Sequence, residues 1–511
     1  MRYAFVQEFL ERSADRLPDK VALVCRGKRL TYAEIEAEAN RMAHALSAHG
    51  IRRGDRVALY LNNSVELVVS LFAALKAGAV FVVINPTTKL DKLAYILRNC
   101  QASVLITSPS RADLATRLLR DLPGLRFGVV TPGGDSPAAH ANLHAYDHLL
   151  SGAPSTRPPR KGIDLDLACL IYTSGSTGEP KGVMSDHGNV TFAVGSITSY
   201  LENEEDDVVI DVLPLSFDYG LYQLLMTFSF GGTLVLEEGF AYPAAILQRM
   251  EAERVTGFPG VPTLYSMLLS MDLSSFDLSC LRYLTNTAAA LPPDHIRRLR
   301  EKFPKVRVYS MYGLTETKRT LYLPPSQLDA RADSVGIPIP GTEAWLEDAQ
   351  GNRVGPGEVG ELVVRGRHVM RGYWGDAEAT AQRFPPGPLP GERVCRTGDL
   401  FRMDSEGYFY FVAREDDIIK SRGEKVSPKE IENVLYRLPG VLEAAVVGIP
   451  DPILGQAVKA FLVVNGAAPS EAEVLRHCRA NLEDFMVPRV IEFRHELPKT
   501  PSGKIKKAEL R

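Results

Sequence analysis

The stretch TYAEIEAEANRMAHALSAHGIRRGDRVALYLNNSVELVVSLFAALKAGAVFVVI, residues 31–84, decides the fold class. Its first part has the apolar spacing of an amphipathic helix over Tyr32–Ala48, and Thr31 is the expected N-cap. The run Arg56–Leu61 predicts a short buried strand, Glu66–Lys76 predicts the next helix, and the last apolar residues predict another strand. Helices that alternate with buried strands are typical of α/β layers built on mainly parallel sheets.

The whole chain has the size and composition of a folded protein with several structural units. Its 511 residues exceed what one hydrophobic core usually organises. A formal net charge of -3, without any basic run, argues against binding to nucleic acid. The most apolar region, Val68–Ile84, is interrupted by Lys76 and Gly78 and is too short to cross a membrane. The N-terminus also lacks the apolar stretch of a signal peptide, so we expect a cytoplasmic protein.

Cysteines and histidines give no metal-binding pattern. The six cysteines include no Cys-x-x-Cys pair, which indicates reduced and mostly buried thiols. A helix would place His140, His144 and His148 on one face, but no carboxylate pattern accompanies them. The surrounding residues 131–162 are rich in glycine, proline and small residues, so we interpret them as a surface connection.

The character of the chain changes after the expected strand Gly407–Val412, where the densely charged segment Arg414–Lys425 begins. Beyond this segment the pattern predicts a helix, two strands and a second helix, over Pro428–Arg437, Ala444–Val447, Ala457–Val464 and Glu471–Leu482. We therefore expect a large N-terminal domain of residues 1–413, with parallel sheets flanked by helices. A small, mobile α+β domain of residues 414–511 would follow it.

The strongest local motif is Thr173–Gly182, which follows the expected strand Leu167–Tyr172. Three glycines permit close approach of the backbone, four hydroxyls can donate hydrogen bonds, and Lys181 adds positive charge. These properties suit a loop that binds polyphosphate. The motif is not a Walker A loop, because it lacks the G-x-x-x-x-G-K-[ST] pattern.

A second glycine motif, Gly355–Gly360, matches the dinucleotide fingerprint G-x-G-x-x-G in letters only. That fingerprint has to follow a strand and open a helix, whose N-terminus then faces the pyrophosphate. Here the glycines precede Glu361–Arg365, which has the composition of a strand. We therefore reject a dinucleotide site at this position.

Six segments, taken in order, resemble the adenylate-forming superfamily, which includes acyl-CoA synthetases, adenylation domains of nonribosomal peptide synthetases and firefly luciferase. They are Tyr172–Gly182, Tyr312–Glu316, Gly360–Leu362 with Gly372–Trp374, Arg396–Asp399, Arg414–Lys420 and Pro501–Lys504. The resemblance covers nearly the whole chain at the spacing of the family. It implies an enzyme that uses ATP and Mg²⁺ to convert a small carboxylic acid, such as an amino acid, into an acyl-adenylate with release of pyrophosphate. The acyl group then passes to a thiol.

The resemblance also implies roles for individual residues. The phosphate loop would consist of Thr173, Ser174, Gly175, Ser176, Thr177, Gly178 and Lys181. Thr315 would hold phosphate and Glu316 would bind Mg²⁺, while Tyr312 would lie against adenine. The ribose would be bound by Asp399, supported by Arg414. Asp416 would be the hinge between the domains, and Lys420 and Lys504 would be catalytic lysines.

The acid itself is less well defined. In the resemblance, the acyl pocket would be lined by Phe217, Asp218, Thr287, Ala288, Ala289 and Gly313. Amino-acid-activating relatives carry Phe-Asp at this point, and their aspartate pairs with the substrate ammonium. A carboxylate in apolar surroundings needs a cationic partner. For Asp218 that partner is either a substrate amino group or the side chain of Lys318 or Arg319, which come just after the motif Tyr312–Glu316.

The thiol acceptor is expected to be separate from this chain, because the sequence ends at Arg511, just after the terminal lysine motif. Coenzyme A and a stand-alone carrier protein present the same pantetheine thiol, so both remain open. Two other functions also remain open. One is a nucleotide-binding homologue without catalytic activity, and the other is an enzyme of the luciferase type that oxidises its adenylate.

Overall fold

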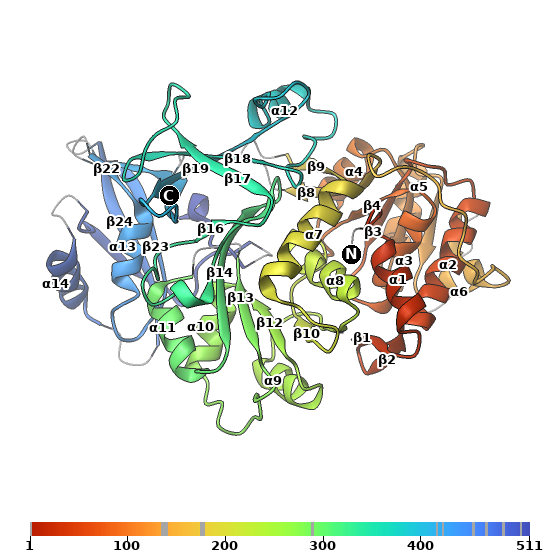
Figure 1. Ribbon diagram of the computed structural model, residues 1–511, viewed down its shortest axis with the longest axis horizontal. Coiled ribbons are helices and arrows are strands. Elements are labelled where there is room, and N and C mark those ends of the chain that lie inside the picture. Colours follow the sequence, from red (N-terminus) through yellow and green to blue (C-terminus); the bar gives the residue numbers. More distant parts are fainter. Residues whose placement is uncertain are drawn as a thin grey trace. The chain divides into compact units, whose positions relative to one another are not determined.

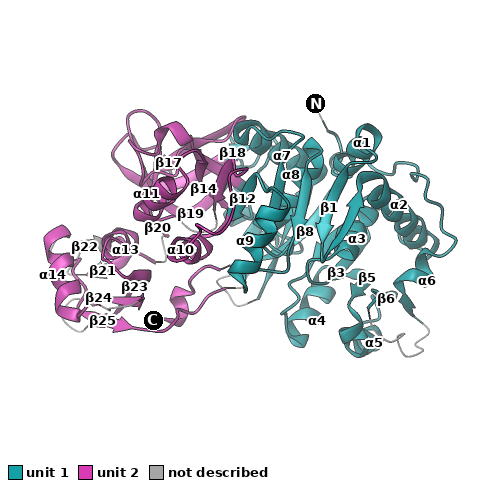
Figure 2. Ribbon diagram, turned by 90° about the horizontal axis from the view of Figure 1, so that it is seen from below, with its two compact units in different colours: residues 1–259, 315–318, 365–395 teal, residues 260–314, 319–364, 396–511 magenta. Residues whose placement is uncertain are grey.

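The protein is described by a computed structural model covering residues 3–133, 142–173, 179–287, 291–414, 417–421, 424–451, 455–465, 469–482, 486–500 and 503–510. The chain forms two compact units (Figure 2). Unit 1 contains Met1–Pro259, Thr315–Lys318 and Arg365–Cys395, and unit 2 contains Gly260–Leu314, Arg319–Val364 and Arg396–Arg511. Each unit is therefore assembled from three separate stretches of chain.

Unit 1 contains a sheet in which, among the described residues, every neighbouring pair except β8 and β9 is parallel. In spatial order its strands are β7 (Leu143–Ala145), β6 (Phe127–Val130), β5 (Ala102–Thr107), β3 (Arg56–Tyr60), β4 (Val80–Val83), β8 (Leu167–Thr173) and β9 (Lys181–Asp186). Helices α4 (Leu90–Asn99) and α5 (Ala112–Asp121) bury their apolar faces in one core with β3, β4 and β5. Figure 2 shows these two helices on one side of the strands and α2 and α3 on the other.

A second group of strands in unit 1 runs in the order β12 (Gly257–Gly260), β10 (Val208–Asp211), β11 (Thr233–Leu236), β1 (Val21–Cys25) and β2 (Lys28–Thr31). Only β1 and β2 pair in antiparallel fashion among these described strands. The other helices of unit 1 are α1 (Glu8–Arg16), α2 (Tyr32–Ala48), α3 (Val65–Lys76), α6 (Tyr146–Leu150), α7 (His187–Leu201), α8 (Asp218–Phe230), α9 (Pro243–Ala252) and α12 (Ala377–Arg383). The prediction of α/β layers with mainly parallel sheets is confirmed.

Local sequence signals explain where these helices begin. The Thr31 side chain accepts a hydrogen bond from the Glu34 amide, while the Glu34 side chain accepts one from the Thr31 amide, so the predicted cap of α2 is a full capping box. Ser64 caps α3 in the same region, and Asp186 forms a capping box at the start of α7. The region that decides the fold class therefore has the helices expected from its sequence.

The interpretation of residues 131–162 as a surface connection is wrong for residues 143–150. Here β7 extends the parallel sheet and α6 follows it directly. The physical reason is that Leu143, Tyr146 and Leu149, spaced three residues apart, are all buried. Polar residues between them hide this short apolar pattern. His140 lies outside the described residues.

Unit 2 contains the strands β13 (Tyr283–Asn286), β14 (Arg307–Leu314), β15 (Lys318–Leu323) and β16 (Ile337–Pro338), neighbours in the order β16-β15-β14-β13. A second sheet has the order β17 (Thr342–Glu347), β18 (Val359–Gly366), β19 (Cys395–Met403) and β20 (Phe409–Arg414). Helices α10 (Pro262–Ser270) and α11 (Pro293–Lys302) belong to this unit. Because Gly355–Gly360 leads into β18 and not into a helix, the rejection of a dinucleotide fingerprint is supported.

The last hundred residues of unit 2 form a small sheet covered by two helices (Figure 1). Its described strands are β22 (Glu424–Val426), β21 (Ile419–Ser421), β24 (Gly455–Val464) and β23 (Val441–Asp451), with β25 (Val490–Phe493) paired to β24. The helices α13 (Pro428–Leu435) and α14 (Glu471–Asn481) share one apolar core with these strands. The predicted helix, two strands and helix are all present, and the domain boundary at residue 413 stays a prediction.

No helix among the described residues is both long enough and apolar enough to span a membrane.

Candidate active site

Glu316 lies in unit 1 beside the segment of residues 370–376. The Tyr373 hydroxyl donates a hydrogen bond to Glu316 Oε1 at 2.6 Å, and the Met370 amide donates to the Glu316 carbonyl at 3.0 Å. Both Glu316 and Tyr373 are buried. Burial first, and the nearby Glu316 carboxylate second, raise the pKa of Tyr373 well above its ordinary value. Tyr373 is therefore a neutral hydrogen-bond donor to this carboxylate.

The segment that carries Tyr373 pairs with strand β9 through its backbone. The Met184 amide donates to the Gly372 carbonyl at 2.9 Å, and the Trp374 amide donates to the Gly182 carbonyl at 2.7 Å. Gly372 has a φ of 132°, and a Cβ at this position would collide with the side chain of Thr380. Glycine is thus required for the chain to run along β9 and still bring Tyr373 to Glu316.

The two ends of the expected phosphate loop lie opposite each other. Thr173 ends β8 and Lys181 begins β9, and the two are partners in this antiparallel pair. The Lys181 ammonium is 3.3 Å from Asp376 Oδ2 and lies 5.3 Å from the centre of the Tyr373 ring. The predicted loop residues Ser174, Gly175, Ser176, Thr177 and Gly178 lie outside the described residues. Thr315 is half-buried and directly precedes Glu316.

Within unit 2, three of the predicted nucleotide-binding residues meet. The Tyr312 hydroxyl donates to Asp399 Oδ2 at 2.6 Å, and Arg414 Nε is 3.2 Å from Asp399 Oδ1. Asp399 and Arg414 are opposite each other on the antiparallel strands β19 and β20. The Tyr312 ring packs edge-on against Phe401 at 4.9 Å between ring centroids. Gly313 follows Tyr312 at the end of β14 and is half-buried.

Of the terminal lysine motif, Gly503 and Lys504 are described, and both lie in unit 2. The Lys504 amide donates to Thr500 Oγ1 at 3.0 Å, and the Thr500 amide donates to the Lys504 carbonyl at 2.7 Å. Gly503 has a φ of 80°, and a Cβ at this position would lie 3.1 and 3.3 Å from the side chains of Val261 and Thr263, at the start of α10. Lys504 itself is exposed to solvent. Asp416 lies outside the described residues, and of Lys420 only the backbone in β21 is described.

Asp218 has its cationic partner inside the protein. The residue begins α8, and its Oδ1 lies 2.6 Å from the ammonium of Lys318. The Lys318 side chain is 0% exposed, and its ammonium also faces the ring of Tyr222 at 5.5 Å. Of the two explanations left open by the sequence, the structure supports the pair with Lys318.

His368 is a buried neighbour of this pair that the sequence did not reveal. Burial first and the positive charge of Lys318 second lower the pKa of His368 to about 3. Its ring stacks on Phe192 of α7, with centroids 5.8 Å apart and an interplanar angle of 25°. Lys318 therefore pairs with one carboxylate, faces one aromatic ring, and its charge acts on an imidazole that stays neutral at neutral pH.

The other residues predicted to contact the acid are only partly described. Phe217 is the N-cap residue of α8 in unit 1. Thr287 is buried directly after β13 in unit 2. Ala288 and Ala289 lie outside the described residues.

Comparison with known proteins identifies the family of this chain. The family model described as AMP-binding enzyme matches residues 10–374, and the model of the AMP-binding enzyme C-terminal domain matches residues 430–504. This chain belongs to the AMP-binding enzyme family.

Relatives of this AMP-binding enzyme match it along nearly their whole length. A feruloyl-CoA synthase of Amycolatopsis sp is 37% identical over 510 residues, which are 98% of this chain and 97% of the relative. A long-chain-fatty-acid–CoA ligase of Bacillus subtilis (strain 168) is 32% identical and covers 99% and 94% of the two chains. The structure of the anthranilate CoA ligase AuaEII with anthranoyl-AMP superposes with a TM-score of 0.92, at 31% identity, over 100% and 97% of the two chains.

The AMP-binding enzyme is thus an adenylate-forming acid–thiol ligase that uses ATP and Mg²⁺, as predicted. The residues present fit the cation. Mg²⁺ prefers hard oxygen ligands, and the Glu316 carboxylate has one oxygen engaged by Tyr373 and a second oxygen for a ligand. Sequence motifs identified Glu316, Tyr312 and Asp399, but they did not reveal that Tyr373 contacts Glu316. Tyr373 was visible only as part of the motif Gly372–Trp374.

Proposed function

We propose that this ligase forms coenzyme A thioesters of carboxylic acids that carry no ammonium group beside the carboxylate. The observation that carries this proposal is the ion pair between the half-buried Asp218 and the fully buried Lys318. An amino acid would bring its ammonium to a carboxylate that already has a cationic partner. Desolvating that ammonium without a new partner would be costly, so amino acids would bind poorly.

The first half-reaction joins the acid to AMP. A carboxylate oxygen of the acid attacks the α-phosphorus of ATP, the bond to the β-phosphate oxygen breaks, and pyrophosphate leaves. Tyr312, Asp399 and Arg414 would hold the nucleoside, since their contacts in unit 2 place a flat ring beside two acceptor oxygens. Glu316 would hold Mg²⁺, which when bound offsets the negative charge of the phosphates. Lys504 would neutralise charge between the carboxylate and the α-phosphate.

The second half-reaction transfers the acyl group. The sulfur of the thiol attacks the carbonyl carbon of the adenylate, the bond to the phosphate oxygen breaks, and AMP leaves as the thiol loses its proton. We propose coenzyme A as the thiol because relatives that match the full chain are CoA ligases by name. A stand-alone carrier protein remains the alternative acceptor.

Aromatic acids are the first class to test. Two of the full-length matches are named for feruloyl and anthranoyl groups, and a further solved structure is that of a benzoate CoA ligase. Such acids carry their carboxylate on a neutral, planar group. A neutral acyl group is compatible with a site whose one carboxylate on α8 is already paired.

The decisive experiment compares acids that differ only by an ammonium group. We would measure ATP–pyrophosphate exchange with 3-phenylpropanoate against phenylalanine, and with butyrate against 2-aminobutyrate, together with ferulate and benzoate. The proposal expects the acid of each active pair to exceed its amino acid by a factor of at least about 100. Preference for the amino acid would overturn it.

The acceptor is tested on the adenylate formed in that assay. Coenzyme A and a pantetheinylated carrier protein are offered in turn, and the thioester is detected by mass spectrometry. Thioester formation with coenzyme A and not with the carrier supports the proposal. Transfer to the carrier alone, or light emission in the presence of oxygen without a thioester, would contradict it.

A further inference from the structure

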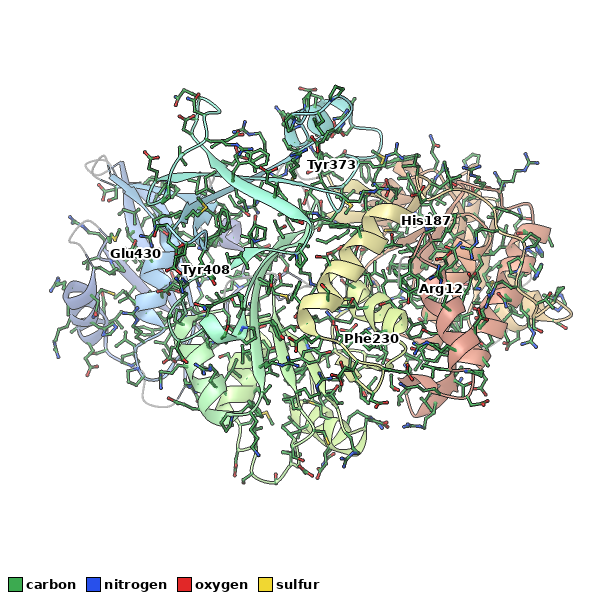
Figure 3. The ribbon with its side chains drawn as sticks, viewed as in Figure 1. Arg12, His187, Phe230, Tyr373, Tyr408 and Glu430 are labelled. Carbon is green, nitrogen blue, oxygen red and sulfur yellow. The ribbon has the colours of Figure 1, made fainter. Side chains whose placement is uncertain are left out.

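The position of the Tyr373 hydroxyl is fixed by contacts that do not involve Glu316. The Tyr373 amide donates to Thr380 Oγ1 at 2.9 Å, and Thr380 Oγ1 donates to the Asp376 carbonyl at 2.6 Å. The Tyr373 ring packs edge-on against Phe384, with centroids 5.6 Å apart. Figure 3 shows Tyr373 next to the segment that carries α12. The hydroxyl is thus part of a rigid local structure.

Glu316, in contrast, lies on a short segment between two strands. It is one of the residues between β14, which ends at Leu314, and β15, which begins at Lys318. Its carboxylate accepts the hydrogen bond from the Tyr373 hydroxyl at 2.6 Å. A hydrogen bond to a carboxylate is stronger than one between neutral groups, so this contact favours one orientation of the Glu316 side chain.

We infer that Tyr373 is a positioning residue, which holds Oε1 of Glu316 so that Oε2 is presented to the cation that accompanies ATP. This inference rests on the proposed role of Glu316 in adenylation. Groups that hydrogen-bond a metal ligand orient it, and losing them typically weakens metal binding about 10–100-fold. Tyr373 would act in this way although it touches neither the cation nor the substrate.

The same tyrosine contacts the lysine at the end of the phosphate loop. Lys181 lies over the Tyr373 ring and pairs with Asp376, three residues further along. The backbone of residues 371–374 is bonded to β9, the strand that Lys181 begins. One tyrosine therefore links the expected cation ligand to the strand that follows the phosphate loop. This places Tyr373 where it can set the spacing between two groups that act on the same phosphates.

The test distinguishes the contribution of the Tyr373 hydroxyl from that of the Tyr373 ring. Tyr373→Phe removes the hydrogen bond to Glu316 and keeps the packing on Phe384 and the contact with Lys181. The matched control is Tyr32→Phe, because Tyr32 is also buried in unit 1 and donates its hydroxyl to the Gly232 carbonyl at 2.7 Å. Glu316→Gln and the double variant Tyr373→Phe/Glu316→Gln complete the set.

Binding of the cation and of ATP is measured in the absence of catalysis. Mn²⁺ is titrated into each protein with ATP and followed by electron paramagnetic resonance, and ATP binding without metal is followed by fluorescence of Trp374 in a Trp345→Phe background. We expect Tyr373→Phe to weaken Mn²⁺·ATP binding about tenfold, to leave metal-free ATP binding unchanged, and to raise the KM for MgATP. Tyr32→Phe should behave like the wild type.

The double variant tests whether Tyr373 acts through Glu316. If it does, Tyr373→Phe adds nothing to the loss caused by Glu316→Gln. Wild-type Mn²⁺·ATP affinity in Tyr373→Phe, or losses that add in the double variant, would overturn the inference. These outcomes differ from failure of the proposed function, which would show as absence of acid-dependent pyrophosphate exchange in the wild type.

Discussion

Two lysines of this ligase, Lys318 and Lys504, occupy opposite environments. Lys318 is fully buried, lies 2.6 Å from the Asp218 carboxylate and has a left-handed backbone with a φ of 57°. Lys504 is exposed, and its backbone amide donates a hydrogen bond to Thr500 Oγ1. Lys504 belongs to a segment that motif comparison singled out, and Lys318 lies two residues after another, Tyr312–Glu316.

The difference between Lys318 and Lys504 shows that burial determines which role a lysine can have. A charge removed from water has to find its partner within the fold, because an isolated buried ion is very costly. An exposed ammonium keeps its hydration and can exchange it for a substrate that arrives with negative charge. We therefore expect Lys318 to matter for folding and for the choice of acid, and Lys504 to matter for chemistry alone.

The largest effect expected is on stability, from Lys318→Met. This change leaves the half-buried Asp218 carboxylate without its partner, which should lower the free energy of unfolding by about 3–5 kcal/mol. Urea unfolding at pH 7 measures it. The double variant Asp218→Asn/Lys318→Met removes both charges and should regain most of the loss. If both variants lose the same amount, the pair does not account for the effect.

A loss of comparable size, but in catalysis, is expected for Lys504→Ala. Removing a group that stabilises charge in a transition state typically slows the reaction about 10²–10³-fold. We expect this loss in acid-dependent ATP–pyrophosphate exchange, with unchanged unfolding by urea. Transfer of the acyl group from a supplied acyl-adenylate to coenzyme A should survive. An equal loss in both half-reactions would contradict the division between the two lysines.

Sequence reasoning succeeded where the signal is local. Thr31 has its capping box, and the motif residues Tyr312, Asp399 and Arg414 meet in unit 2. Short motifs pointed to each of these residues, but they did not predict the contact between Tyr312 and Asp399, which are 87 positions apart. The buried triplet of Leu143, Tyr146 and Leu149 was missed because so short an apolar pattern does not stand out among small and polar residues.

Contacts between distant segments could not be predicted in the same way. The sequence left two partners open for Asp218, since the choice depends on how the start of α8 packs against residues about 100 positions later. The bond between Tyr373 and Glu316 joins residues 57 positions apart. His368 stands in no pattern at all. Burial and long-range packing determine these contacts, and a short sequence motif contains no information about either.

The exposed lysine is expected to work only with a moving domain, which Asp416→Pro tests. Asp416 occupies the hinge position of the motif Arg414–Lys420. Proline fixes φ near −65° and so prevents a hinge from changing its backbone angles. We expect thioester formation to slow about 10²-fold, the size of effect that misplacing a reacting group can cause, while adenylation is kept.

The control for this variant is its folding. Thermal unfolding should match the wild type, since proline at a hinge would restrict one backbone angle and leave the cores of both units unchanged. Measuring each half-reaction on the folded protein decides the matter. Equal losses in both steps, with unchanged thermal unfolding, would show that Asp416 is not a hinge.

The smallest effect comes from His368, the neighbour of the buried lysine. In the folded protein burial and the Lys318 charge lower its pKa from 6.5 to about 3. When the pH falls below 6.5, the unfolded chain therefore binds a proton that the folded protein does not. Stability is lost as the pH falls through this range and levels off only near pH 3.

Between pH 7 and pH 5 the contribution of His368 to this loss should be about 2 kcal/mol. His368→Phe, whose ring can still stack on Phe192, should remove it. Urea unfolding of both proteins at pH 7 and pH 5 gives the difference, in which the other buried histidines His187 and His295 cancel because they are common to both. Parallel losses in the two proteins would mean that His368 takes up its proton in the folded state. The environment of Lys318 would then be open to water, and the contrast with Lys504 would disappear.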